Sequence, residues 1–231
     1  MLAPRSDGHV FEYTGRRPVV QDDFRNVFGE ANSELADRYY SSHSEPEAVS
    51  ILEELGVRYV VASAAEPRRI GGYGLRSMFA RLSLPQGYLE RSVGSGRSET
   101  KVPVTRLAHH RLIYETPAFD GRRGKARSYY KLYEVVSGAR VEGSAPPGTR
   151  VEARLLLSAE PKGELLFLAV AEAGASGRYG FTVPYPNEPF SEGMRSADSY
   201  RLVSALGETS FRVSEAAVRG GEVIEGPSLA W

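Results

Sequence analysis

The chain has 231 residues, of which 41% are hydrophobic and 25% charged, with 29 basic residues, 29 acidic residues and no cysteine. This composition is typical of a globular protein and excludes a disulfide scaffold, a thiolate zinc site and a cysteine nucleophile. The zero net charge argues against a nucleic-acid partner bound by phosphate neutralisation. The longest apolar run, residues 165–171, falls short of the roughly 20 residues that span a bilayer.

The first half of the chain predicts a mixture of helices and strands. Residues 22–41 have helical spacing of apolar residues, and we expect Gly29 and the pair Asn32-Ser33 to divide this segment into two helices. Ser44 and Glu47 then have capping-box spacing. An apolar stripe at helical spacing follows, made of Ala48, Ile51, Leu52 and Leu55.

Gly56 stands where a helix cap is expected, and residues 57–62 predict a buried strand directly after it. This succession of helix, glycine turn and strand is typical of an α/β layer. The remaining predictions for this half are a short helix at 75–82, a polar loop at 86–101, a helix or strand at 107–115, a basic loop at 120–128 and a strand at 129–136.

The second half changes to short alternating runs separated by glycine and proline turns. We expect strands at 139–143, 149–157, 164–171, 179–183, 200–204, 210–213 and 222–225. The predicted fold is therefore an α+β or α/β unit over residues 1–137, followed by an antiparallel β-sandwich over residues 138–231.

Common catalytic motifs, such as a phosphate loop or a nucleophile elbow, do not occur in the sequence. Polar residues concentrate near the N-terminus instead, where Asp7, His9, Arg17, Asp22 and Asp23 surround several glycines. This density is typical of a site at a loop mouth or of a polar N-terminal arm. One interpretation is a hydrolase in which His9 pairs with Asp7 or Asp22 and Arg17 binds an anion.

Several short strings, read in order, resemble one family. They are Ser6 to His9 (SDGH), Tyr13 to Phe24 (YTGRRPVVQDDF), Leu52 to Val61 (LEELGVRYVV), Tyr130 to Gly143 (YKLYEVVSGARVEG) and Gly177 to Pro186 (GRYGFTVPYP). In this order they resemble the C-terminal extracytoplasmic region of the catalytic subunit of archaeal and bacterial-type oligosaccharyltransferases. That region carries a W-W-D-Y-G motif, and a peripheral β domain follows.

The resemblance implies part of a membrane glycosyltransferase that transfers a glycan from a lipid-linked donor to a protein asparagine. Its partners would be the transmembrane region of the same polypeptide, the acceptor polypeptide and the lipid-linked glycan, at the extracytoplasmic face of the cell membrane. The resemblance also implies that a divalent Mg or Mn ion is held in the membrane part, with no cofactor or catalytic residue in this chain. The chain alone is therefore expected to be inactive.

The sequence departs from the family pattern at the acceptor motif. When Gly8-His9 is aligned with the family's glycine and histidine, Pro4 and Arg5 replace the two tryptophans, and Ser6 replaces the aspartate that helps to read the acceptor's hydroxyl. The family's second motif, D-x-x-K-x-x-x-[MI], has no match after residue 61. The candidate acceptor-region residues are Asp7, His9, Arg17, Asp22, Asp23 and Met78.

An alternative is that the β-sandwich is a carbohydrate- or protein-binding module without catalysis. Tyr179, Tyr185 and Phe190 would then be stacking platforms for sugar rings, or else residues of a small β core.

Overall fold

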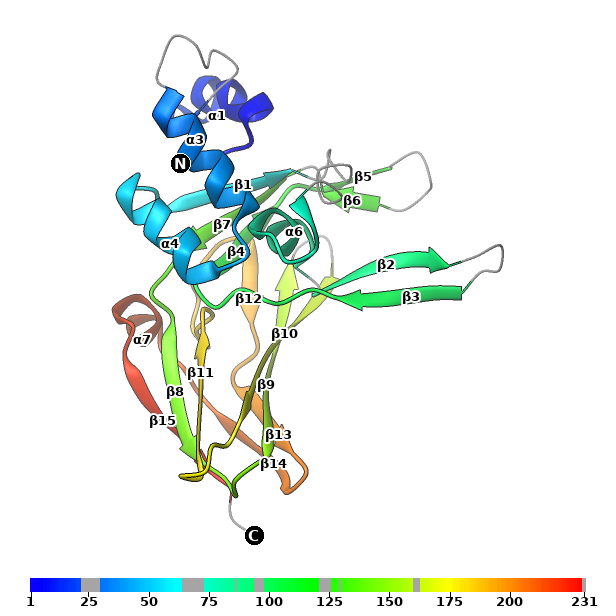
Figure 1. Ribbon diagram of the computed structural model, residues 1–231, viewed down its shortest axis with the longest axis vertical. Helices are drawn as coiled ribbons and strands as arrows, with labels where there is room; N and C mark the ends of the chain where they lie inside the picture. The colour runs from blue at the N-terminus through cyan, green and yellow to red at the C-terminus, as the bar shows by residue number, and fades with distance from the viewer. Residues whose placement is uncertain are drawn as a thin grey trace. The chain divides into compact units, whose positions relative to one another are not determined.

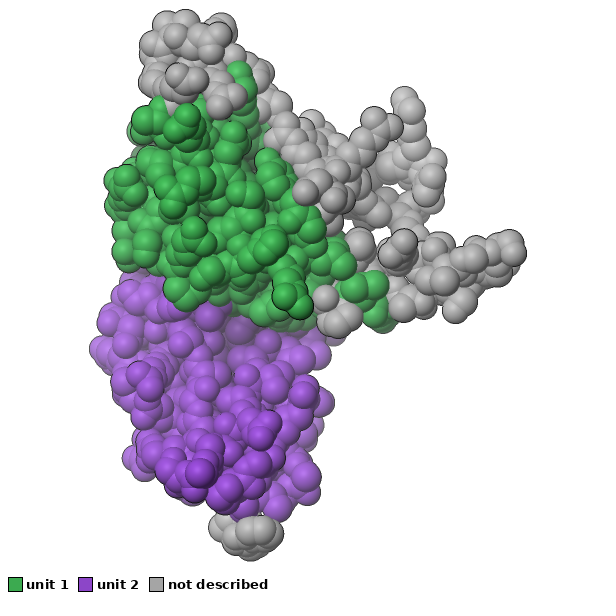
Figure 2. All heavy atoms as spheres, viewed as in Figure 1, with its two compact units in different colours: residues 1–107, 115–135 green, residues 108–114, 136–231 purple. Residues whose placement is uncertain are grey.

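The computed structural model describes residues 1–21, 30–63, 73–85, 87–93, 98–120, 126–128, 130–159 and 163–229. The chain forms two compact units, residues 1–107 with 115–135 and residues 108–114 with 136–231 (Figure 2). The described part is rich in β-structure, with several antiparallel sheets and few helices (Figure 1). Within it, every helix is too short or too polar to cross a lipid bilayer.

Unit 1 contains the predicted helix, turn and strand. Helix α4 (Glu45–Glu54) begins where the Ser44 hydroxyl accepts a hydrogen bond from the Glu47 amide at 3.4 Å. Gly56 follows with φ of +62°, a conformation that glycine adopts without strain. The chain then enters β1 (Tyr59–Ser63), and both predicted elements are confirmed.

Helix α3 (Glu30–Ser41) is continuous through Asn32 and Ser33, so the predicted break there is wrong. Ser33 is buried, which shows that tertiary packing outweighs the weak helix propensity of these two residues. Residues 22–29, where the helix was expected to start and to break at Gly29, lie outside the described residues.

The sheet of unit 1 is built on β1. This strand pairs antiparallel with β7 (Tyr130–Val135), with Val61 opposite Leu132. On β1, Leu2 forms a parallel bridge to Val60, in which the Leu2 amide donates to the Tyr59 carbonyl and the Val61 amide to the Leu2 carbonyl, each at 2.8 Å. The N-terminal segment is thereby fixed beside β1.

Helix α6 (Met78–Ser83) packs against α3 and β1 and starts later than predicted, because the Ser77 hydroxyl accepts from the Ala80 amide at 3.2 Å. The helix contributes a buried ion pair, in which Arg81 Nη2 lies 3.2 Å from Glu45 Oε2. Burial lowers the pKa of Arg81, and the nearby Glu45 carboxylate opposes this effect. The pair joins the last turn of α6 to the first turn of α4.

Two segments predicted as loops contain strands. Strands β2 (Tyr88–Val93) and β3 (Ser98–Pro103) pair antiparallel within residues 86–103. Strands β5 (Ala118–Asp120) and β6 (Ala126–Ser128) pair around the predicted basic loop, whose residues 121–125 lie outside the described part. Both predictions were wrong because backbone pairing between neighbouring strands forms a hairpin even where side chains are mostly polar. The ambiguous segment 107–115 contains a strand, β4 (His110–Glu115).

Unit 2 takes residues 108–114, which include most of β4, and the chain from residue 136 onward. Its elements are β8 (Ala139–Ser144), β9 (Arg150–Ala159), β10 (Gly163–Glu172), β11 (Arg178–Val183), β12 (Met194–Ser196), β13 (Tyr200–Ser204), β14 (Gly207–Phe211), α7 (Glu215–Gly220) and β15 (Val223–Ser228). One sheet has the order β10-β9-β13-β14, with β12 also paired to β9, and a second has the order β11-β8-β15.

Most predicted strands of unit 2 are confirmed, with three differences. Helix α7 and the short strand β12 were not predicted. Strand β15 pairs parallel with β8, so the sheets are not entirely antiparallel. The core of this unit includes Arg111, whose two Nη groups donate to the carboxylate of Glu215 at 2.6 and 2.8 Å. This bidentate pair fastens β4 to the first turn of α7.

Candidate functional site

The N-terminal segment of unit 1 closes into a loop beside β1. After Leu2 the chain forms a short 3-10 helix, Arg5–Asp7, and then α1 (Gly8–Gly15), which ends at Arg16 in a left-handed conformation with φ of +48°. The chain returns at Gln21, whose side-chain amide donates to the Ala3 carbonyl at 3.1 Å. Residues far apart in this segment are thus held together.

This loop and α3 enclose a cavity of about 10 Å³ within unit 1. The cavity is lined by Pro4, Arg5, Gln21, Asp37, Tyr40, Tyr73 and Phe79. Its aromatic wall is rigid, because Tyr40 donates its hydroxyl to the Val61 carbonyl at 2.9 Å and packs edge-on against Phe79. A space of this volume holds about one water molecule or one hydroxyl group.

Two polar atoms at the cavity have no partner within the described part of the chain. Arg5 Nε is a donor, Gln21 Oε1 is an acceptor, and both atoms are buried. An unsatisfied buried polar atom costs roughly 1–3 kcal/mol, so each of these atoms is a candidate contact for a bound group. A hydroxyl group or a water molecule is chemically suited to either atom, since it can accept from Arg5 or donate to Gln21.

The four candidate acceptor residues that the structure describes are not among the residues that line the cavity. Asp7 is half-buried at the N-cap of α1, while His9 and Arg17 are exposed. Met78 is buried at the start of α6, with its sulfur 3.8 Å from Arg81 Nη1. Asp22 and Asp23 lie outside the described residues. His9 and Arg17 do not line the cavity, and the hydrolase interpretation stays a hypothesis.

The sequence did offer a signal for Arg5, which occupies the position of the second tryptophan in the aligned acceptor motif. It offered none for Gln21, because only the closure of the loop brings Gln21 to the same cavity.

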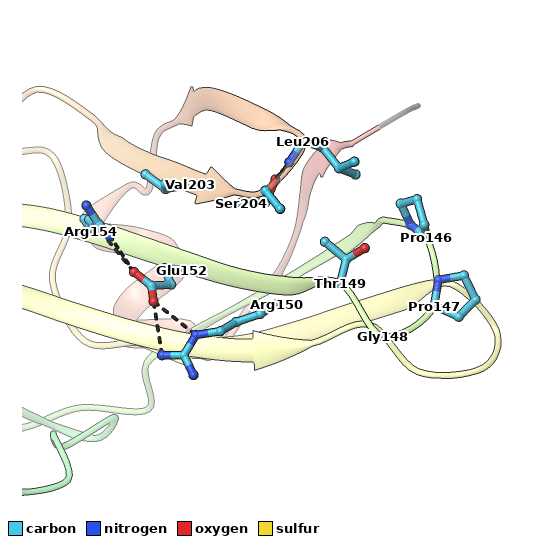
Figure 3. Close-up of a pocket in the computed structure, with 11 residues that line it drawn as sticks. Pro146, Pro147, Gly148, Thr149, Arg150, Glu152, Arg154, Val203, Ser204 and Leu206 are labelled. Carbon is cyan, nitrogen blue, oxygen red and sulfur yellow. Dashed lines mark hydrogen bonds and ion pairs between the residues drawn. The ribbon is translucent and has the colours of Figure 1, made fainter.

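Unit 2 has an open pocket of about 600 Å³ on its larger sheet. The pocket is lined by Pro146, Pro147, Gly148, Thr149, Arg150, Glu152, Arg154, Val203, Ser204, Ala205 and Leu206. Figure 3 shows that the charged side chains form one row along β9, while Pro146, Pro147 and Leu206 lie around the start of that strand. The row is exposed because alternate residues of β9 point outward from the core.

Glu152 holds both arginines of the row. Arg150 Nε donates to Glu152 Oε1 at 3.1 Å, and Arg154 donates to Oε2 through Nη2 at 2.7 Å and through Nε at 3.2 Å. The hydrogen bonds from Arg154 and then Arg150 lower the pKa of Glu152, against the raising effect of burial. The carboxylate is therefore ionised at neutral pH, and the row carries a net charge of about +1.

The proposed aromatic platforms are part of the core of unit 2. Tyr179 is 3% exposed and Tyr185 is 6% exposed. The Tyr179 hydroxyl donates to the Pro227 carbonyl at 2.6 Å, and the Tyr185 hydroxyl accepts from the Leu112 amide at 2.9 Å. Phe190 is half-buried beneath the Arg111 guanidinium, 5.1 Å from the ring centre. Tyr179 and Tyr185 thus serve packing, as the second of the two interpretations from the sequence has it.

Within the described ranges, His, Asp and Glu side chains form no group of three or more that could hold a metal ion. The expectation that a divalent Mg or Mn ion is bound outside this chain stays a prediction.

A comparison with protein-family models gives a match within unit 2. Residues 138–224 match the family model described as the archaeal glycosylation protein B long peripheral domain. None of the curated proteins compared with the chain matches it.

Solved structures of the Archaeoglobus fulgidus oligosaccharyltransferase are similar to nearly the whole chain. The apo form has a TM-score of 0.73 and 16% identity, covering 99% of this chain and 37% of that one. The complex with Zn and sulfate has a TM-score of 0.71 and 15% identity, covering 99% and 41%. The complex of AglB with an inhibitory peptide and a dolichol-phosphate has a TM-score of 0.71 and 16% identity, covering 99% and 37%.

The chain therefore has the fold of the C-terminal part of an oligosaccharyltransferase and spans about two fifths of the length of those structures. Together with the family match over residues 138–224, this confirms the predicted resemblance. Residues 138–224 thus resemble the archaeal peripheral domain in sequence, and the chain resembles the C-terminal part of the archaeal oligosaccharyltransferase in fold.

Proposed function

We propose that the chain acts as the extracytoplasmic C-terminal part of an oligosaccharyltransferase-like membrane enzyme. The observation that carries this proposal is the shared fold over 99% of the chain, together with the family match at 138–224. The similar A. fulgidus protein has been solved with a tethered acceptor peptide that contains the NVT sequon and, separately, with a dolichol-phosphate. By analogy, the reaction would move a glycan from a lipid-linked donor to an asparagine.

In this proposal unit 1 is a mixed α/β unit on the acceptor side of the enzyme. Arg5 aligns with the motif that reads the acceptor's hydroxyl in the family that the sequence resembles. The unsatisfied Arg5 Nε and Gln21 Oε1 suit a hydroxyl group chemically, since one donates and the other accepts. The hydroxyl of a serine or threonine of the acceptor would occupy the cavity.

Unit 2 would be a β-sandwich that serves as a peripheral structural or docking domain. The two sheets of this unit and the contacts of β10 with β11 and of β14 with β15 support this interpretation. The membrane region that binds the lipid-linked glycan and the divalent Mg or Mn ion would be the chain's partner at the extracytoplasmic face.

The chain alone is expected to be catalytically silent, because the proposed donor and metal sites lie in the membrane region. Purified protein mixed with lipid-linked glycan, a divalent cation and an Asn-Val-Thr peptide should give no glycopeptide by mass spectrometry. Turnover under these conditions would contradict this part of the proposal.

The acceptor role is tested by peptide binding to the purified chain. We expect Arg5→Met and Gln21→Leu each to weaken binding of an Asn-Val-Thr peptide by about tenfold, the loss of one good hydrogen bond in a buried site. Arg38→Met is the matched control, because Arg38 is an exposed arginine of α3 that does not line the cavity, and it should bind as the wild type does. Equal affinity in all four proteins would contradict the acceptor role.

A further inference from the structure

The open pocket of unit 2 lies on the face of a sheet, and its floor cannot pair with an added strand. Strand β9 already pairs with β10 on one side and with β12 and β13 on the other. Strand β13 lies between β9 and β14. The backbone groups of both strands are used in these ladders, so a ligand must bind through side chains, which argues against an extended peptide.

The side chains of the charged row offer donors rather than acceptors. A carboxylate has about four acceptor positions. Glu152 accepts two hydrogen bonds from Arg154 and one from Arg150, and Arg150 Nη2 lies 3.1 Å from Glu152 Oε1. Within the described part of the chain, Glu152 is the ion-pair partner of both arginines, which leaves their Nη1 groups for a ligand. The Thr149 hydroxyl at the same pocket can donate as well.

Two further carboxylates lie near the row. Glu208 of β14 forms its ion pair with Arg201 of β13 and also interacts electrostatically with Arg154, more weakly than with Arg201. Glu172 is the cross-strand neighbour of Arg150 on β10 and is exposed to solvent. Among the lining residues themselves there are two cations and one anion, so the pocket favours a negative group only where that group contacts Arg150 and Arg154 directly.

The rest of the lining is aliphatic. Pro146 and Pro147 contribute rings from the turn before β9, and Val203 and Leu206 come from β13 and the turn after it. The Leu206 side chain is 39% exposed, so much of its apolar surface is open to solvent. Such surfaces pack against the C–H faces of a compact ring, and a volume of about 600 Å³ falls in the range of small-molecule sites.

We propose that this pocket binds a saccharide that carries a carboxylate group. The carboxylate accepts from the Nη1 groups of Arg150 and Arg154, which Glu152 holds in position. The ring lies against Pro146, Pro147 and Leu206, and Thr149 donates to a ring substituent. The site is separate from the acceptor cavity of unit 1, so either proposal can fail without the other.

The test is a calorimetric titration of the full chain with a disaccharide that ends in glucuronic acid. The same disaccharide with the carboxyl group reduced to the alcohol is the neutral probe. We expect the acidic disaccharide to bind at least about tenfold more tightly, and the preference to fall as salt rises. Equal binding of the two probes, or no heat with either at millimolar concentration, would overturn the proposal.

Variants test whether the acidic disaccharide binds at the charged row of β9. Arg154→Ala should lower the affinity for the acidic disaccharide by at least about tenfold, as expected for the loss of a charged donor. Arg195→Ala is the matched control, because Arg195 is an exposed arginine of β12 outside the pocket lining, and it should leave the affinity unchanged. Equal affinity of Arg154→Ala and the wild type would overturn the proposal. Acetate and inorganic phosphate are titrated as further probes. If these ions bind as tightly as the disaccharide, the pocket is a simple anion site and the proposal is overturned.

Discussion

The cavity of unit 1 and the pocket of unit 2 differ in the burial and in the pairing of their arginine side chains. In the cavity, Arg5 Nε is buried and unsatisfied, and the enclosing residues leave space for one small group. In the pocket, Arg150 and Arg154 are exposed and already paired with Glu152. A ligand of the first arrangement would be selected by the shape and hydrogen-bonding capacity of one group, and a ligand of the second by its charge.

The buried ion pair of unit 1 should show the largest effect on stability. Arg81→Met leaves Glu45 buried without its cation, and breaking a buried pair typically costs about 3–5 kcal/mol of unfolding free energy. Urea denaturation of the variant measures this loss. Arg38→Met removes an arginine whose pairing with Glu47 is exposed, so this control should cost less than about 1 kcal/mol. Equal losses would show that the Arg81 pair is not the buried link described here.

The scaffold behind the pocket is expected to respond to alkaline pH. Burial raises the pKa of Tyr179 to about 12, above its ordinary value of 10. Because the folded state holds this proton more tightly than the unfolded state, its contribution is complete below about pH 10 and is lost as the pH rises toward 12.

Tyr179→Phe removes this titration and the hydrogen bond to the Pro227 carbonyl. The variant should be about 1 kcal/mol less stable at pH 7 and should lose less stability than the wild type between pH 10 and pH 12. Denaturation curves at both pH values measure the difference, and an unchanged pH slope would contradict the assignment to Tyr179.

Arg5→Met tests whether Arg5 lacks a hydrogen-bond partner in the free protein. Replacing an unsatisfied donor with an apolar chain of similar length should raise the free energy of unfolding by up to about 1 kcal/mol, while peptide binding falls. Such a trade of stability for function is common at binding sites. A clear loss of stability, measured by urea denaturation, would show that Arg5 has a structural partner in the free protein.

The smallest effect on stability is expected at the pocket. Arg154→Ala removes a side chain that is 44% exposed, so the free energy of unfolding should change by less than about 0.5 kcal/mol. Thermal melting of the variant beside the wild type measures this. A larger loss would mean that the row stabilises the sheet and that a weaker ligand affinity reflects damage to the fold.

Local signals explain which elements could be predicted from the sequence. Helix α4 was predictable because its cap, apolar stripe and terminal glycine lie within 13 residues, from Ser44 to Gly56. Similar signals surround α7, where Ser214 caps the helix and Gly221 ends it with φ of +67°, and they were overlooked. The hairpin of β2 and β3 could not be recognised, since its strands are polar and their pairing is not visible in composition.

The sites depended more on tertiary structure. The alternation along β9 predicts that Arg150, Glu152 and Arg154 share one face, but the opposite wall comes from Val203 to Leu206, about 50 residues later. Likewise, the cavity needs the loop that brings Gln21 to Arg5 and the helix that supplies Tyr40.

The most direct test of the acceptor role is an NMR titration of the chain, observing the side-chain amide of Gln21. Two peptides that differ only in Thr or Val two residues after the asparagine are compared. We expect the Thr peptide to shift the Gln21 amide signal and the Val peptide to leave it in place, while the side-chain amide of Asn187 in unit 2 stays constant with both. Equal shifts with both peptides, or no shift with either, would contradict the claim that unit 1 reads an acceptor's hydroxyl.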